Sequence, residues 1–311
     1  MLRMLFILTF LIACFAEVTS SETLYFVASG DDIDSNLLLN KEAIKENNSN
    51  SIFQLVNTED TVMYKSVSVG DIQNDKEAQG RNFLFYVHGY GKELDDVIKR
   101  SLQIQRSYGV RVIFFYWPYR NSKGKQTNLR QAKNIIRQHQ QQFAFFLSLR
   151  GEFAKKNPDA KVSLMAHSLG NQFLKDYAFY LQGNNEVRPF DNIILNSAAV
   201  NDKNHAEWLS KLSIQNNIYI ISNRHDFLLR GLRLFTHSKR PLGVRVKSER
   251  LGAVNYIDMS EIIGRQKPRY NSHSFFTGDM PDSKDEVFTM YQQLLNGFDY
   301  RVKKSNVSTH H

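Results

Sequence analysis

The chain has only one cysteine in 311 residues, Cys14, and it lies within the N-terminal apolar segment. A single thiol cannot form an intrachain disulfide, so the fold must depend on its hydrophobic core. The 9 histidines show no His-Glu-x-x-His or comparable ligand spacing, and no strand-like segment is followed by Gly-x-Gly-x-x-Gly. We therefore expect neither a catalytic metal nor a Rossmann-type cofactor.

Proline, glycine and repetitive sequence are also scarce. Only 6 prolines and 16 glycines are spread along the chain, and the nearest approach to a low-complexity tract, the Asn-rich stretch Glu46–Ser51, is interpreted as a loop. With 42% hydrophobic and 23% charged residues, the composition is ordinary for a globular protein with a substantial core. The length allows one large domain or two smaller ones, and we expect a single domain over residues 21–311.

No apolar run after the N-terminus is long enough to cross a membrane. At the N-terminus, Arg3 precedes the apolar run Met4–Ala16, and small polar residues follow it. This order is typical of a secretory signal peptide, predicted here at residues 1–20, so we expect an exported protein. Two routes stay open. Cleavage after Ser20 would give a secreted or periplasmic protein, whereas Leu11–Cys14 resembles a lipobox that would anchor the protein by lipid on Cys14; we favour the first.

The formal net charge is +9, and the leader adds nothing to it because Arg3 offsets Glu17. Such a charge favours contact with anionic surfaces such as lipid headgroups. Basic residues are dispersed, however, apart from Lys303–Lys304 and the segment Arg230–Arg250. Since no zinc-finger, RNP-type or basic heptad pattern is present, specific nucleic-acid binding is not predicted.

Beyond Gly80, short apolar runs alternate with amphipathic stretches, which predicts an α/β fold with a mostly parallel, doubly wound sheet flanked by helices. The predicted strands are Phe83–Val87, Arg111–Trp117, Val162–Ala166, Asn192–Leu195, Ile218–Ser222 and Ala253–Asp258, with leading strands at Thr23–Ser29 and Thr61–Ser68. The predicted helices are Leu94–Tyr108, Thr127–Lys156, Leu169–Leu181, Asn204–Leu212 and Lys284–Leu295. Residues 227–250 show no clear pattern, and we interpret them as an insert or lid.

The most specific segment is Ala166-His167-Ser168-Leu169-Gly170. An apolar strand precedes it and a helix follows it, the context of a nucleophile elbow, in which a serine sits at a strained turn between small residues. Ser168 is therefore the predicted nucleophile, although Ala166 replaces the usual first glycine. The N-terminus of the following helix points at the site where negative charge develops, so Leu169 N–H is one expected oxyanion donor.

The second oxyanion donor is expected in the loop His88-Gly89-Tyr90-Gly91, which follows an earlier strand. Its glycines allow the loop to fold over the site, and Tyr90 N–H is the expected donor. His88 precedes the nucleophile and follows a different strand, so we interpret it as a loop-stabilising residue and not as the general base.

A serine needs a base, and the base needs an orienting carboxylate. In the α/β-hydrolase order of nucleophile, acid and histidine, Asp226 follows the strand Ile218–Ser222 and His273 follows the last strand. Both are therefore predicted catalytic residues. Asp202, after the preceding strand, competes for the role of acid. His225, beside Asp226, and His237, within the insert, are weaker candidates for a catalytic role.

Taken together, the ordered motifs resemble the bacterial family of α/β-hydrolases of unknown function, whose members are similar to esterases and lipases. The motifs are His88-Gly89-Tyr90, Phe115–Pro118, Ala166–Asn171, Asn223-x-x-Asp226 and Ser272-His273-Ser274, and the resemblance covers roughly Phe83 to Phe276. It implies a triad of Ser168, Asp226 and His273 but supplies no substrate. The family's usual apolar-Asp dipeptide after the sixth strand is Val200-Asn201-Asp202 here, which leaves the role of Asp202 open.

These residues predict a serine hydrolase that cleaves small-molecule or lipid-like esters through an acyl-enzyme. The same chemistry would serve an acyltransferase or a peptidase, and a hydrolase fold that has lost activity would serve as a binding protein. The cluster Phe114–Pro118 ends a strand near the expected site; it suits one wall of an apolar pocket, but aromatic residues at such places more often belong to the core.

Overall fold

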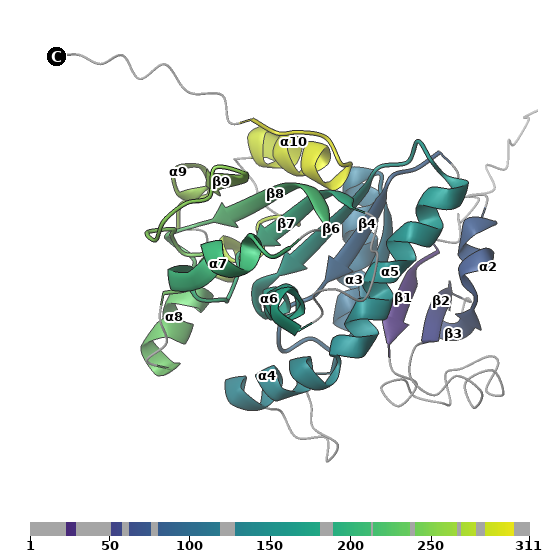
Figure 1. Ribbon diagram of the computed structural model, residues 1–311, viewed down its shortest axis with the longest axis horizontal. Helices are drawn as coiled ribbons and strands as arrows, with labels where there is room; N and C mark the ends of the chain where they lie inside the picture. Colours follow the sequence, from purple (N-terminus) through teal and green to yellow (C-terminus); the bar gives the residue numbers. More distant parts are fainter. Residues whose placement is uncertain are drawn as a thin grey trace, which may run out of the picture.

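In the part of the chain that the structure describes, nine strands form one sheet, in the order β3-β2-β1-β5-β4-β6-β7-β8-β9 (Figure 1). In this computed structural model the described residues are 23–28, 51–57, 62–75, 80–118, 128–180, 189–212, 214–236, 240–265, 269–277 and 284–301. The predicted leader at residues 1–20, with Cys14, lies outside them, as do His237 and Lys303–Lys304. The strands are β1 (Tyr25–Ala28), β2 (Ser51–Asn57), β3 (Val62–Val67), β4 (Phe83–Val87), β5 (Arg111–Phe115), β6 (Val162–His167), β7 (Phe190–Asn196), β8 (Gln215–Ser222) and β9 (Val254–Asp258).

In the spatial order β1-β5-β4-β6-β7-β8-β9, every neighbouring pair of strands is parallel. Strand β2 pairs antiparallel with both β1 and β3. Every residue of β4, β5 and β6 is buried, as expected for parallel strands covered on both faces, which are continuously apolar instead of alternating. The carboxyl ends of these strands share one edge of the sheet. Loops that follow β4, β6, β8 and β9 are thereby brought together.

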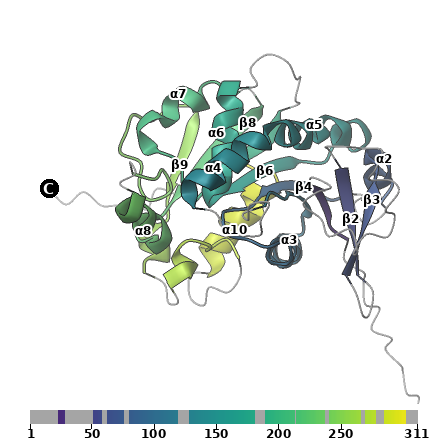
Figure 2. The same cartoon turned by 90° about the horizontal axis from the view of Figure 1, so that it is seen from below.

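Helices cover both faces of the sheet (Figures 1 and 2). On one face lie α4 (Leu129–Gln138), α5 (Gln140–Lys156), α6 (Asn171–Tyr180) and α7 (His205–Leu209), and on the other lie α3 (Leu94–Tyr108) and α10 (Lys284–Leu295). A short helix, α2 (Val69–Gln73), contacts α5 near the β3 edge. None of the described helices is both long and apolar enough to cross a bilayer.

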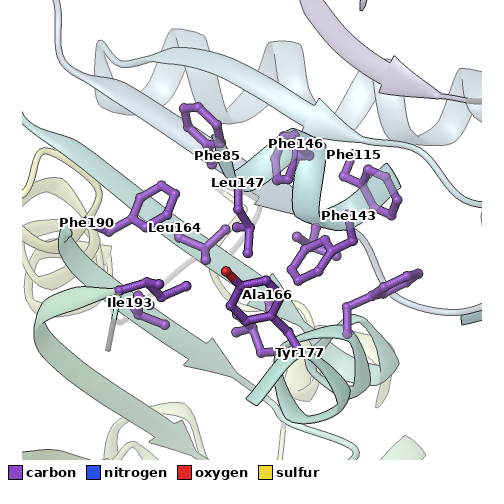
Figure 3. Close-up of a cluster of buried hydrophobic side chains, with 14 of the residues drawn as sticks. Phe85, Phe115, Phe143, Phe146, Leu147, Leu164, Ala166, Tyr177, Phe190 and Ile193 are labelled. Carbon is purple, nitrogen blue, oxygen red and sulfur yellow. The ribbon is translucent and has the colours of Figure 1, made fainter. Parts of the chain in front are cut away.

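The core divides into two clusters because successive strand residues point to opposite faces. Phe85 faces α5 and Tyr86 faces the side of α3 and α10. On the α5 face, aromatic rings pack closely: the Phe85 and Phe146 centroids are 4.9 Å apart, and those of Phe115 and Phe143 are 5.5 Å apart (Figure 3). This packing fixes α5 and α6 against the central strands, including β6, which leads into the elbow.

Most predicted elements are present, and β4, α3 and α10 have the predicted bounds. The single helix predicted for Thr127–Lys156 is wrong, because the chain breaks at His139 into α4 and α5. Both helices pack on α6, and α5 also contacts β1 and α2. Strand β2 was not predicted, since polar Ser51, Gln54 and Asn57 interrupt its apolar residues.

Regular structure also occurs in residues 227–250, where none was predicted. They begin with α8 (Phe227–Thr236), and residues 240–243 then run along the loop after β7. Leu242 N–H donates to Val200 O at 2.8 Å and Gly243 N–H donates to Ala198 O at 2.9 Å. A Cβ on Gly243 would lie 2.3 Å from Ala198 N, so only glycine allows this close approach. The insert is therefore attached to the sheet edge at which the loops converge.

Candidate active site

Ser168 sits at a sharp junction between strand and helix. Strand β6 ends at His167, a short 3-10 helix (η4, Ser168–Gly170) follows, and α6 begins at Asn171. Ser168 has a φ of 54°, in the left-handed region that residues other than glycine rarely adopt. The sequence thus forms the strained elbow that its small residues predicted.

Close packing explains why the residue two positions after Ser168 is glycine. A Cβ on Gly170 would lie 2.5 Å from His88 O and 3.0 Å from Val87 O, too near for any side chain. Asn171 holds the strained turn, because its Nδ2 donates to Ala166 O at 2.8 Å and to Ser168 O at 3.0 Å. The elbow is therefore fixed both by its neighbouring strand and by its own helix.

A histidine and a carboxylate lie together on the loops of the last two strands. Nδ1 of His273 is 2.6 Å from Oδ2 of Asp226, and both side chains are buried. The other oxygen of Asp226 accepts a hydrogen bond from Leu229 N–H at 3.0 Å, at the start of α8. Asp226 follows β8, while His273 follows β9 and a 3-10 turn (η6, Arg269–Ser272). The structure thus brings these two predicted residues into contact.

The backbone of His273 is held by side chains that sequence reasoning did not single out. Ser197 Oγ donates to His273 O at 2.9 Å, and Asn223 Nδ2 donates to the preceding Ser272 O at 3.0 Å. Ser197 has a φ of 43°, so the end of β7 is strained in the same way as the elbow. Asn223 belongs to the Asn-x-x-Asp motif, a signal that could have marked it, but nothing in the sequence marks Ser197.

The two residues predicted to supply the oxyanion donors, Leu169 and Tyr90, both line the cavity with Ser168. Leu169 is the residue after it, and at the start of a helix its N–H has no carbonyl partner within the helix. Tyr90 comes from the loop after β4 and lines the same cavity as Ser168 and Leu169. A Cβ on Gly89 would lie 2.9 Å from Ser168 Cβ, so glycine lets this loop approach the serine.

His88 contacts its own loop and the aromatic residues after β5. Its Nε2 accepts a hydrogen bond from Trp117 N–H at 3.2 Å, so Nδ1 carries the proton and donates to Gly89 O at 2.8 Å. The ring also stacks on Tyr116 and Trp117, with centroids 5.6 Å and 5.2 Å away. Burial lowers the pKa of His88 to about 4, which keeps it neutral. The aromatic cluster after β5 therefore acts as core that supports the loop.

His167, immediately before Ser168, is neutral as well. Burial, with a smaller effect from His273, holds its pKa well below the ordinary value. Its Nε2 lies 3.3 Å from His273 O, a carbonyl that can only accept, so this nitrogen carries the proton. His167 thus helps to position the loop that carries His273.

Asp202, the alternative acid, contacts the insert. Its Oδ1 accepts from Ser248 Oγ at 2.8 Å, and Oδ2 accepts from Lys247 N–H at 3.2 Å. The neighbouring His205 lies between Ser248 Oγ at 3.0 Å and Tyr256 Oη at 2.8 Å. These contacts give Asp202 a role in anchoring the insert. His225, beside Asp226, has its Nε2 3.3 Å from Nε of the exposed Arg224.

A cavity of about 570 Å³ opens at this edge of the sheet, a size typical of small-molecule sites. All predicted site residues except Asp226 line it, together with an apolar wall that includes α8. The lining comprises Gly89, Tyr90, Gly91, Lys92, Arg100, Leu129, His167, Ser168, Leu169, Ala199, Leu228, Leu229, Leu232, His273 and Ser274. Within the described part of the chain, no group of three His, Cys, Asp or Glu side chains could hold a metal ion.

Residues 68–258 match the model of a family described as alpha/beta hydrolase of unknown function (DUF900). The chain belongs to this family. The sheet order and the two helical layers agree with an α/β-hydrolase fold. In this member of the family, the matched segment includes Ser168 and Asp226, while His273 lies beyond its end. No curated protein matches the chain.

Two solved structures share a distant likeness with this α/β-hydrolase. An uncharacterised protein from Capnocytophaga ochracea DSM 7271 is 9% identical, with 87% of this chain and 64% of that chain covered and a TM-score of 0.39. MenH from S. aureus is 13% identical, with 69% of this chain and 93% of that chain covered and a TM-score of 0.30. The chain thus spans less than two thirds of the first protein's length, and neither likeness bears on the chemistry of the site.

Proposed function

We propose that this protein is a serine hydrolase that cleaves ester-like bonds through an acyl-enzyme on Ser168. The observation that carries the proposal is the buried pair of His273 and Asp226, 2.6 Å apart, beside a cavity that Ser168 also lines. A buried carboxylate on one imidazole nitrogen is the arrangement that prepares the other nitrogen to act as a base. The strained Ser168 backbone adds support, because strain in a serine at such a turn is typical of nucleophile elbows.

The proposed reaction begins with His273. Its Nδ1–H donates to Asp226, which leaves Nε2 unprotonated and able to take the proton of Ser168 as Oγ attacks the ester carbonyl. The tetrahedral intermediate places a negative charge near the backbone N–H groups of Leu169 and Tyr90, the expected oxyanion donors. His273 then gives its proton to the departing alkoxide, which yields the alcohol and an acyl-enzyme.

Deacylation repeats these steps with water as the nucleophile. His273 takes a proton from water, the hydroxide attacks the acyl carbonyl, and Ser168 Oγ leaves with the proton that His273 returns. Transfer to an alcohol acceptor would use the same acyl-enzyme, but no described feature favours such an acceptor over water. Hydrolysis is therefore the form of the reaction that we propose.

The lining of the cavity favours an ester with an apolar portion. Leu129, Leu228, Leu229 and Leu232 line it together with Ala199, and burying apolar surface contributes roughly 25 cal/mol per Å². Helix α8 supplies three of these leucines, so we propose that it acts as a lid over the acyl portion. Leu228 is 47% exposed, which leaves apolar surface available for contact with a substrate.

A series of 4-nitrophenyl esters with lengthening acyl chains tests the proposal. We expect saturable hydrolysis, with kcat/KM rising with chain length until the apolar wall is filled. Methanol added at increasing concentration separates hydrolysis from transfer, since a transferase would form methyl esters at the expense of free acid. Turnover no faster than that of Ser168→Ala with every ester would contradict the proposed function.

A further inference from the structure

The cavity pairs its apolar wall with two positive charges, and this asymmetry suggests a substrate class. Lys92 lies in the loop after β4 and Arg100 lies on α3, and both line the cavity with Ser168. We propose that the site binds esters that carry a negatively charged group, a carboxylate or a phosphate, which Arg100 and Lys92 hold. This inference rests on the proposed function and names the substrate class of that site.

Arg100 is held in place by groups that leave its charge uncompensated. Its Nη1 donates to Thr277 Oγ1 at 2.8 Å, and its guanidinium carbon lies 5.4 Å from the centre of the Phe276 ring. Both partners are uncharged. They belong to the segment that carries His273, so the guanidinium is tied to the same loop as the proposed base.

Other buried or half-buried arginines have carboxylate partners. Arg111 pairs with Asp75 at 3.5 Å, and Arg150 pairs with Asp191 at 3.6 Å. Among the described residues Arg100 and Lys92 make no such ion pair, and the cavity lining contains no Asp or Glu. A charge that faces an apolar cavity gains most from an oppositely charged partner, which here a ligand would supply.

The positive charges of Arg100 and Lys92 affect another side chain of the cavity lining. Both Arg100 and Lys92 help to lower the pKa of His167, the residue before Ser168, although burial is the main cause. With His167 neutral, Arg100 and Lys92 are the fixed positive charges of the lining. Most of the apolar residues come from α4 and α8. An amphiphilic ester, with one anionic end and one apolar end, matches both parts of the cavity.

Matched ester pairs test the charge preference on both sides of the scissile bond. Mono-4-nitrophenyl suberate and 4-nitrophenyl octanoate differ by a charge on the acyl chain, while 4-carboxyphenyl and 4-carbamoylphenyl butyrate differ by a charge on the alcohol. We expect Arg100→Gln to lower the ratio of anionic to neutral kcat/KM roughly 10-fold or more for one pair, because a charge-assisted contact is lost. Arg100→Lys should retain part of the preference.

Lys99→Gln is the control, since it removes one positive charge from the neighbouring position of α3, and Lys99 is exposed and does not line the cavity. Its ratio should equal that of the wild-type protein. The wild-type preference should also fall as salt rises, because ions screen a half-exposed charge. If Arg100→Gln slows both members of each pair equally, Arg100 supports the fold or the reaction in general, and the anion site is refuted while the hydrolase is not.

Binding provides a readout that does not depend on turnover. Calorimetric titration of the Ser168→Ala protein with octyl phosphate should give a dissociation constant at least ~10-fold lower than that of the double variant with Arg100→Gln. Circular dichroism and a melting curve check that the double variant folds. Equal dissociation constants would overturn the proposal even if the protein hydrolysed no ester, and a clear difference would support the anion site independently of the catalytic assignment.

Discussion

At the scale of single residues, the sequence shows which residue types the candidate site contains. It does not show the backbone conformations on which the site also depends. Ser168, Asp226 and His273 follow predicted strands, so their meeting at one edge could be foreseen from chain order. Ser197 could not, because its role depends on a φ of 43° that serine rarely adopts. Ser197 holds the carbonyl of His273, but unlike Asn223 it belongs to no motif that the sequence displays.

Variants of Asp226 and Asp202 can test which of the two carboxylates is the catalytic acid. Asp226→Asn should keep the fold and lower turnover by a factor on the order of 10³ or more, because His273 would lose both its tautomer control and the stabilisation of its charged form. Asp202→Asn should leave turnover much less affected and should lower the melting temperature, since Asp202 accepts hydrogen bonds from the insert. Ester kinetics and thermal melts of both variants are the measurement. A larger loss of turnover in Asp202→Asn would reverse the assignment.

His88 gives a prediction about pH. Burial lowers its pKa in the folded protein from 6.5 to about 4, so between these values the unfolded chain binds a proton that the folded protein does not. Stability is therefore lost as the pH falls from 6.5 towards 4, by on the order of 3 kcal/mol, and is unaffected by His88 above this window. Urea unfolding of His88→Gln should show a shallower loss over this range. Parallel curves for the two proteins would contradict a neutral, buried His88.

At the scale of elements, periodicity predicted helices and strands well where one apolar face or a continuous apolar run was present. The bounds of β4, α3 and α10 are as predicted. Periodicity failed where tertiary contacts decided where an element begins or ends. The break at His139 separates α4 from α5; both pack on α6, and α5 also contacts β1 and α2. Helix α8 was missed because Gly231 and the basic residues around it obscured its amphipathic pattern. The sequence contains no local signal that residues 240–243 run beside the loop after β7.

That attachment of the insert can be tested at one glycine. Gly243→Ala would place a Cβ 2.3 Å from backbone atoms of Ser197 and Ala198, so the two segments must separate, at a cost of roughly 1–3 kcal/mol or more. Turnover should also fall, because Ser197 holds the carbonyl of His273. Gly252→Ala is the matched control, since nothing lies within 4 Å of its Cβ position. Equal urea midpoints for the two variants would show that the insert is not tightly attached.

At the scale of the whole molecule, only a few residues of the sequence separate the end of the proposed leader at Ser20 from the start of β1 at Tyr25. Cleavage after Ser20 would leave β1, which starts at Tyr25 and pairs with both β2 and β5. We predict that deletion of residues 1–20 leaves the melting temperature unchanged, whereas deletion of residues 1–28 prevents folding because buried Tyr25 and Phe26 are lost. A folded product of the longer deletion would show that β1 is dispensable.

The predicted export can be tested by measuring the mass of the protein that the native host exports. Intact-mass analysis of the exported protein should show a chain that begins at Ser21, with no mass for the preceding residues. A chain that begins at Cys14 with a diacylglycerol increment would favour the lipid-anchored route. A mass that includes Met1 would contradict both routes.

A fluorophosphonate probe, which bonds covalently to an activated serine, tests whether Ser168 is the nucleophile. Peptide mass spectrometry of the labelled wild-type protein should find the probe on Ser168. Ser168→Ala should lose all labelling, while Ser274→Ala, which removes another serine that lines the same cavity, should label like the wild-type protein. A folded Ser168→Ala protein that still labels at the wild-type rate, or a wild-type protein that never labels, would contradict the account.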